Sequence, residues 1–296
     1  MSAALDLRPA VNSTTVRSTK AGLPPWARAG FGVLQSVAPS LAAEAAARMF
    51  FATRRGAPRR GERDVLAGAS PFFVEAAGER VAAWSWGAGP TVVLVHGWNG
   101  RATQLGALVA PLVESGRRVV ALDHPGHGES TGRSATVVQM GAAVRAVAQA
   151  AGGAHGLVAH SLGAVASTLA ISAGLPGERA VFVAPPLAAE PWRHHLAREV
   201  GLDERGIEAT RERIERRAGR TLASLRLTDL APALRTPLLI VHDRDDREVP
   251  IESGEALSYA WPRSRLLVTA GLGHHKILGS PGVIESARRF LTRAGA

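Results

Sequence analysis

From Thr91 onward, short apolar runs alternate with stretches of helical periodicity. Uninterrupted apolar runs of this length are typical of strands buried on both faces, as in a parallel sheet covered by its connecting helices. The sequence therefore predicts an α/β fold in which a mostly parallel sheet is flanked by helices. The expected strands are Thr91–Val95, Arg118–Asp123, Leu157–His160, Ala180–Ala184, Pro237–His242 and Leu266–Thr269, preceded by the hairpin strands Phe72–Ala76 and Val81–Trp86. The expected helices are 103–115, 134–151, Leu162–Ala173 and a closing helix from Pro281 to about Arg293.

One connection breaks this alternation, because residues 185–235 lie between two expected strands yet have helical patterns. The predicted helices are Pro191–Val200, Asp203–Ala218 and Leu222–Leu230. The segment leaves the carboxyl edge of the sheet, where α/β proteins bind ligands. We therefore expect a helical cap, or lid, inserted into a core of residues 70–184 and 236–296. Its apolar side chains would line a substrate pocket, with Leu187, Trp192 and Leu196 as candidates. Padding of the sheet edge and a dimer surface are the alternative roles.

Residues 1–69 precede the expected core and comprise a tail, a helix and an Arg-rich connector. The helix is predicted over residues 26–52. Its apolar positions near one face are Leu34, Val37, Leu41, Ala45 and Met49. That face is expected to pack on the main domain. The connector, residues 54–68, is rich in Gly, Pro and Arg, which favours a loop.

The formal net charge of +10 suggests a nucleic-acid partner, but its distribution does not. Residues 1–64 hold ten basic and four acidic residues, and the chain has no basic stripe interleaved with aromatic residues. We therefore expect no nucleic-acid partner. The apolar stretch 29–43 is shorter than the roughly 20 residues that cross a bilayer, so no integral membrane span is expected. No signal-peptide pattern is found, and a cytoplasmic location is expected. The oligomeric state is not predicted.

A serine stands where an apolar strand is expected to turn into a helix of small residues. The segment reads Ala159-His160-Ser161-Leu162-Gly163. At such a strand–turn–helix junction the serine hydroxyl is exposed on a sharp turn, and the usual pattern is G-x-S-x-G. Ala159 departs from that pattern but is still small. Ser161 is therefore the candidate nucleophile, and the alternative is a serine that only caps the helix.

A nucleophilic serine needs a base and an acid that orients the base. Gly271 and Gly273 precede His274 in a loop after the last expected strand, so His274 is the candidate base. Its neighbour His275 and the serine's neighbour His160 are the alternatives. The loop after Pro237–His242 holds three candidate acids, Asp243, Asp245 and Asp246. The resulting chain order Ser, Asp, His distinguishes this plan from other serine-hydrolase folds.

Developing negative charge on a reacting carbonyl must also be stabilised. The segment Val95–Gly100 leaves the first parallel strand in a Gly-flanked loop that can offer a backbone N–H. Trp98 is the preferred donor position, and Asn99 is its competitor. The N–H of Leu162, directly after the serine, would be the second donor.

These motifs resemble the α/β-hydrolase family, in its esterase- and lipase-like branch with an inserted helical lid. Four motifs match in order: His96-Gly97-Trp98, Asp123–Ser130, the serine turn, and the Asp and His loops. The resemblance covers about residues 70–296. It implies that Asp246 is the acid, because Val249 and Pro250 follow it in the family's D-x-x-V-P context. It also implies that Asp123–Ser130 is a structural loop, so His124 and His127 are not assigned to catalysis.

The expected function is hydrolysis of a small carboxylic ester by Ser161, His274 and Asp246 through an acyl-enzyme. No metal or other cofactor is expected, because the histidines lack useful ligand spacing and the chain has no cysteine. Serine at the nucleophile position disfavours the epoxide- and halide-processing relatives, which use aspartate. Thioesterase, amidase, acyltransferase, perhydrolase and carbon–carbon bond hydrolase activities use the same machinery. A weakly hydrolytic ligand-binding receptor is the alternative from another class.

Overall fold

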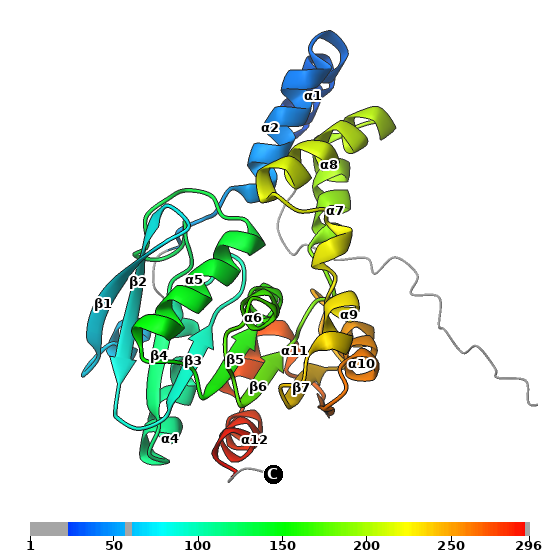
Figure 1. Ribbon diagram of the computed structural model, residues 1–296. Helices are drawn as coiled ribbons and strands as arrows, with labels where there is room; N and C mark the ends of the chain where they lie inside the picture. Colours follow the sequence, from blue (N-terminus) through cyan, green and yellow to red (C-terminus); the bar gives the residue numbers. More distant parts are fainter. Residues whose placement is uncertain (1–22, 57–60, 294–296) are drawn as a thin grey trace, which may run out of the picture.

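The computed structural model describes residues 23–56 and 61–293, without the side chains of Arg63, Glu190, Pro191 and Trp192. Within this part, the strands form one eight-stranded sheet in the order β1-β2-β4-β3-β5-β6-β7-β8 (Figure 1). The first two pairs, β1 with β2 and β2 with β4, are antiparallel, and all others are parallel. The strands are β1 (Ser70–Ala76), β2 (Glu79–Trp86), β3 (Thr91–Val95), β4 (Arg118–Leu122), β5 (Gly156–His160), β6 (Arg179–Val183), β7 (Leu238–Asp243) and β8 (Ser264–Thr269).

Helices cover both faces of the sheet, which confirms the predicted fold class. The apolar core on one face includes side chains of α5 (Val137–Ala150), α6 (Leu162–Ser172), α9 (Leu227–Leu230) and α10 (Ile251–Ala260). The core on the other face includes side chains of η1 (Ala102–Leu108), α4 (Val109–Glu114), η4 (Ile277–Gly279) and α12 (Pro281–Thr292). Alternate residues of β3 contribute to the two cores, as expected for a strand buried on both faces. The short helices α3 (Glu62–Val65) and α11 (Gly273–Lys276) complete this part of the fold.

The single helix predicted over residues 26–52 is wrong, because the structure has two helices there. They are α1 (Pro25–Val37) and α2 (Pro39–Phe51), which meet at Ala38. The break follows from Pro39, which has no N–H to continue the first helix and restricts the residue before it. The expected packing face is also wrong. Val37, Leu41 and Met49 are exposed, and α2 instead buries Ala42, Ala43, Ala46, Ala47 and Phe51.

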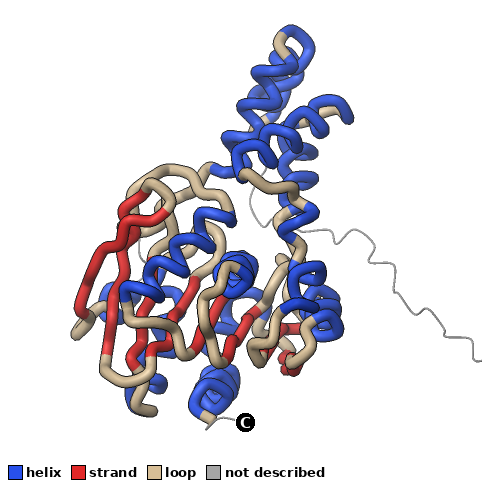
Figure 2. The backbone as a smooth tube through the Cα atoms, viewed as in Figure 1, coloured by secondary structure: helices blue, strands red, loops and turns tan. Residues whose placement is uncertain are grey.

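The connection between β6 and β7 is helical. It contains α7 (Glu190–Val200), α8 (Glu204–Ala218), η2 (Ala223–Leu225), α9 and η3 (Ala231–Ala233). The stretch predicted as one helix over Leu222–Leu230 is thus a series of short turns. Helices α7 and α8 stand with α1 and α2 beyond one end of the sheet (Figure 2), and α2 packs closely along α8. None of the described helices is long and apolar enough to cross a bilayer.

Candidate active site

Ser161 occupies a strained turn between β5 and α6. Its backbone has φ 51° and ψ −126°, a conformation that residues with a side chain rarely adopt. The Ser161 N–H donates to the carbonyl oxygen of Val183 at 2.9 Å, which ties the turn to the neighbouring strand β6. The Ser161 side chain makes no capping hydrogen bond to α6. A capping role therefore does not explain this serine, whereas strain of this kind is concentrated at functional sites.

Two glycines let the backbone approach the serine. A β-carbon on Gly163 would lie 2.6 Å from the carbonyl oxygen of His96, so only glycine allows α6 to pack this close to β3. A β-carbon on Gly97 would lie 2.9 Å from the β-carbon of Ser161. Ala159, which stands where the usual pattern has glycine, is fully buried in the core below the turn. The alanine therefore fits without disturbing the junction.

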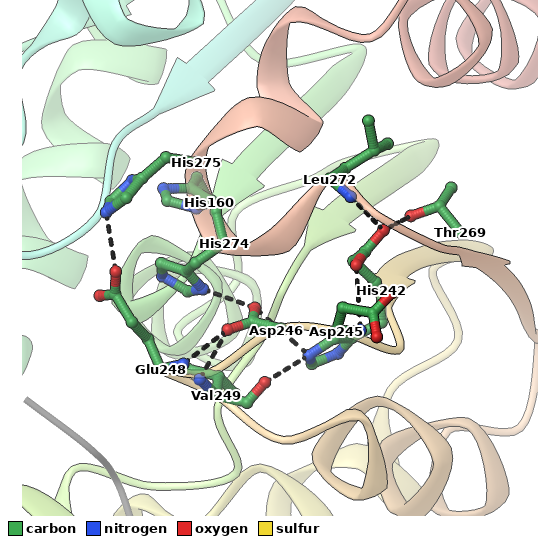
Figure 3. Close-up of polar contacts among 11 residues, drawn as sticks. His160, His242, Asp245, Asp246, Glu248, Val249, Thr269, Leu272, His274 and His275 are labelled. Carbon is green, nitrogen blue, oxygen red and sulfur yellow. Dashed lines mark hydrogen bonds and ion pairs between the residues drawn. The ribbon is translucent and has the colours of Figure 1, made fainter. Parts of the chain in front are cut away.

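His274 and Asp246 are in direct contact (Figure 3). The His274 Nδ1 and the Asp246 Oδ2 are 2.7 Å apart, and both side chains are buried. Burial by itself would raise the pKa of Asp246. The hydrogen bond from His274, the charge of its ring and the N–H groups of Glu248 and Val249 together outweigh burial, so the pKa of Asp246 is lowered. Asp246 is therefore ionised at neutral pH and accepts the proton on Nδ1, which leaves Nε2 as the basic nitrogen of His274.

The other two candidate aspartates bind the segment that leads to His274 rather than its imidazole. Asp243 accepts from the hydroxyl of Thr269 at 2.7 Å and from the N–H of Leu272 at 3.2 Å. Asp245 accepts from the N–H of Gly271 at 2.8 Å. Both therefore hold the segment that leads to His274. Of the three acids that the sequence left open, Asp246 is the one placed against the ring.

The two rival histidines have other partners. His275 Nε2 lies 3.0 Å from Glu248 Oε1, and the His275 side chain is about half exposed. His160 is buried, and its Nε2–H donates to the carbonyl oxygen of His274 at 3.0 Å. The His160 ring also packs against the His274 ring, with centroids 4.7 Å apart. His160 thus supports the loop that carries His274.

In the loop after β3, Trp98 and Asn99 are the two candidates for the oxyanion donor, and their hydrogen bonds distinguish them. The N–H of Asn99 is already used, because it donates to Nε2 of His127 at 3.0 Å. The Asn99 side-chain oxygen accepts from the N–H of Arg54 at 2.8 Å, and the residue has φ 54°. Among the described residues, no acceptor is found for the N–H of Trp98. Leu162 is the first residue of α6, where a backbone N–H has no partner within the helix. Trp98 and Leu162 are therefore the free donors beside Ser161.

A largely apolar pocket opens onto Ser161. The empty space within it is about 670 Å³, which includes the part that is open to solvent. Ser161 and Thr136 supply hydroxyl groups, and the remaining walls are apolar or aromatic. The lining residues are Phe50, Phe51, Trp98, Ala135, Thr136, Val137, Ser161, Leu162, Ala189, Ile214, Ala218, Leu222 and Leu225. The walls thus come from α2, from the core and from the segment between β6 and β7.

The pocket residues differ from those expected. Leu187 packs against the hydrophobic core, and neither Leu187 nor Leu196 is among the lining residues. The side chain of Trp192 lies outside the described part. Sequence reasoning missed Phe50 and Phe51, because α2 lies far from the motifs in the chain. Ile214, an apolar residue of α8, is fully buried and lines the pocket.

Five buried histidines surround the site, and burial lowers the pKa of each. The pKa is lowered to about 4 for His96 and to about 3 for His127. It is also lowered for His124, His160 and His242. The unfolded chain, with histidine pKa near 6.5, therefore binds more protons than the folded chain in mild acid. Stability contributed by these groups is complete above about pH 6.5 and is lost as pH falls toward the folded-state values.

We expect this protein to unfold cooperatively in mild acid, between about pH 6 and pH 4.5. Each histidine can remove up to about 1.4 kcal/mol of unfolding free energy per pH unit, against a typical total of about 5–15 kcal/mol. Asp123 has the opposite effect on the pH dependence of stability, because burial raises its pKa, but it is one group against five histidines. Urea unfolding, followed by circular dichroism between pH 7 and about pH 5, gives the free energy of unfolding at each pH. The slope of this free energy against pH gives the number of protons that the chain takes up on unfolding. Uptake of fewer than about two protons would contradict the prediction.

The sequence matches the model of the alpha/beta hydrolase family over residues 92–287, so the chain belongs to this family. A thermophilic esterase from Thermogutta terrifontis has a similar structure, with 22% identity, a TM-score of 0.59, and coverage of 75% of this chain and 98% of that chain. An esterase from Pyrococcus furiosus shows 18% identity and a TM-score of 0.62, covering 82% of this chain and 97% of its own. A bromoperoxidase from Bacillus anthracis shows 19% identity and a TM-score of 0.59, covering 76% and 100%.

These structural similarities establish the shared fold. No curated protein matches the sequence significantly. Within the described residues, no group of three or more histidines and carboxylates is arranged to hold a metal ion.

Proposed function

We propose that this protein hydrolyses carboxylic esters through a Ser161–His274–Asp246 triad. The Ser161 oxygen attacks the ester carbonyl carbon, and its proton passes to Nε2 of His274. Asp246 holds the ring by Nδ1 and stabilises the imidazolium that forms. The N–H groups of Trp98 and Leu162 receive the oxyanion. The carbon–oxygen bond to the alcohol then breaks, and His274 returns the proton to the leaving oxygen. Water attacks the acyl-enzyme by the same route and releases the acid.

The contact between His274 and Asp246 is the observation that carries this proposal. A buried, ionised carboxylate 2.7 Å from a histidine nitrogen selects one tautomer of the ring. A structural loop has no need of such a pair beside a strained serine. The free N–H groups of Trp98 and Leu162 support the same chemistry, because Trp98 follows Gly97 in the loop that approaches Ser161 and Leu162 follows Ser161 directly at the start of α6.

The pocket indicates the substrate class. Its walls are almost wholly apolar, so a bound acyl chain gains about 0.8 kcal/mol for each methylene that leaves water. A charged or strongly polar acid would lose its hydration there without hydrogen bonds in return. We therefore infer esters of apolar acids. The segment of residues 185–235 acts as a cap, because Ile214, Ala218, Leu222 and Leu225 form part of the wall.

A panel of p-nitrophenyl esters of increasing acyl length tests the proposal directly. We expect kcat/KM to rise by roughly fourfold for each added methylene until the pocket is full. A fluorophosphonate probe should label the protein at Ser161, as found by peptide mass spectrometry. Labelling without turnover on any ester would instead favour a receptor that retains the site. Absence of both would refute the triad.

Phe50 is expected to limit the acyl length, because it lines the pocket from α2. Phe50→Trp should fill part of the cavity and lower the ratio of octanoate to butyrate kcat/KM by roughly tenfold, the effect of excluding about two methylenes. Met49→Trp is the matched control, because Met49 is exposed on the same helix and does not line the pocket. Equal substrate profiles for the two variants would show that α2 does not contact the acyl chain.

A further inference from the structure

Helix α1 has an exposed apolar face. Trp26, Val33 and Val37 are 78%, 64% and 75% exposed, and their spacing of seven and four residues puts them on one face. Phe31 and Leu34, on other faces, are only half-buried. None of the thirteen residues of α1 is fully buried. Leu41, 62% exposed, extends the apolar surface onto α2. We call these four exposed residues, Trp26, Val33, Val37 and Leu41, the hairpin patch.

Such a surface indicates a binding partner. Clustered exposed apolar residues mark sites of interaction with another protein or with a membrane. The chain offers no cover for the hairpin patch among its described residues. The α1–α2 hairpin instead projects beyond the sheet (Figure 1).

The chemistry of the hairpin fits a lipid surface. Between Trp26 and Leu41 the only charged residue is Arg28, which lies on another face of α1 and donates to the carbonyl oxygen of Arg198. The patch can therefore enter an apolar phase without burying a charge. At 13 residues, α1 is about 20 Å long, which is too short to cross the roughly 30 Å hydrocarbon core, so it would lie along the membrane surface. Tryptophan is enriched at the membrane–water interface.

The charge of the sequence within and on either side of the hairpin specifies the kind of lipid. Residues 1–64 contain ten basic and four acidic residues. Basic segments beside an apolar anchor bind anionic headgroups, and each such residue near the surface contributes to the attraction. This basic excess in the sequence thus complements the apolar patch. The two features together favour an anionic bilayer over a protein partner.

We propose that the α1–α2 hairpin docks this protein on anionic lipid bilayers, with the hairpin patch inserted into the interface. Docking would also serve the pocket, because Phe50 and Phe51 at the other end of α2 form its wall. A substrate with an apolar acyl chain, if it resides in the bilayer, would then reach the pocket along α2. The docking itself does not depend on hydrolysis, so it can be tested apart from the proposed function.

The test is flotation of the full-length protein with vesicles of phosphatidylcholine, either alone or mixed with phosphatidylglycerol. We expect binding to the mixed vesicles that weakens with added salt. The variant Trp26→Ser/Val33→Ser/Val37→Ser should lose at least about a hundredfold in affinity, because burial of each such side chain is worth roughly tenfold. The control Phe73→Ser/Tyr259→Ser removes two exposed aromatic side chains that lie outside the hairpin, on β1 and α10, and should bind like the wild type. Hydrolysis of a water-soluble short-chain ester should be the same in all three proteins.

Three outcomes would overturn the proposal. The first is a wild-type protein that floats with neither kind of vesicle. The second is a triple variant that binds as tightly as the control. The third is an analytical ultracentrifugation result in which the wild type is dimeric without lipid, the triple variant is monomeric, and neither binds vesicles. That result would assign the hairpin patch to a second copy of the chain.

Discussion

Ser161→Ala is expected to lower kcat for ester hydrolysis by about 10⁴- to 10⁶-fold, as loss of a triad nucleophile does. The folded state should be nearly unchanged, because the Ser161 side chain makes no capping hydrogen bond that alanine would remove. The measurement is steady-state turnover of the best ester of the panel, together with the thermal midpoint of unfolding. Residual activity within about tenfold of the wild type would exclude Ser161 as the nucleophile.

Ser161→Gly provides a control that separates chemistry from folding. The backbone at this position has φ 51°, which glycine adopts without strain. We expect this variant to be as inactive as the alanine variant yet more stable than the wild type by about 1 kcal/mol. An inactive variant that is also more stable cannot owe its inactivity to unfolding.

Asp246→Asn is expected to lower kcat/KM by about 10⁴-fold, because the amide can donate to Nδ1 and reverse the tautomer of His274. The proton would then sit on Nε2, the nitrogen that must accept it from the serine. The matched variants are Asp243→Asn and Asp245→Asn, whose carboxylates accept from backbone N–H groups of the histidine loop. We expect these two to retain activity within about tenfold and to lower the thermal midpoint instead.

The comparison of the three aspartate variants uses kcat/KM on one ester and the thermal midpoint, measured on the same preparations. If Asp243→Asn or Asp245→Asn is as inactive as Asp246→Asn while still folded, the acid has been assigned to the wrong carboxylate. If Asp246→Asn is nearly as active as the wild type, the contact with His274 has no catalytic role.

The sheet strands and the serine turn could be predicted because their signals are local. A run such as Thr91–Val95 is apolar throughout, since both of its faces are covered, and the fold class follows from the repetition of such runs. Close approach at Gly163 likewise follows from the small residues around Ser161. The break in the N-terminal helix was also a local signal, because Pro39 lies within the apolar stretch that was predicted to be one helix.

The sequence by itself determined which kinds of residue could react and in what order, whereas the tertiary structure decided which of them meet. Nothing in the spacing distinguishes Trp98 from Asn99, and the choice rests on His127, which lies on another loop and takes the N–H of Asn99. Likewise, the pocket wall formed by Phe50 and Ile214 joins two helices that are far apart in the chain. Local patterns depend on backbone geometry that repeats within a few residues. A pocket or a hydrogen-bond partner depends instead on segments that come together only when the whole chain packs.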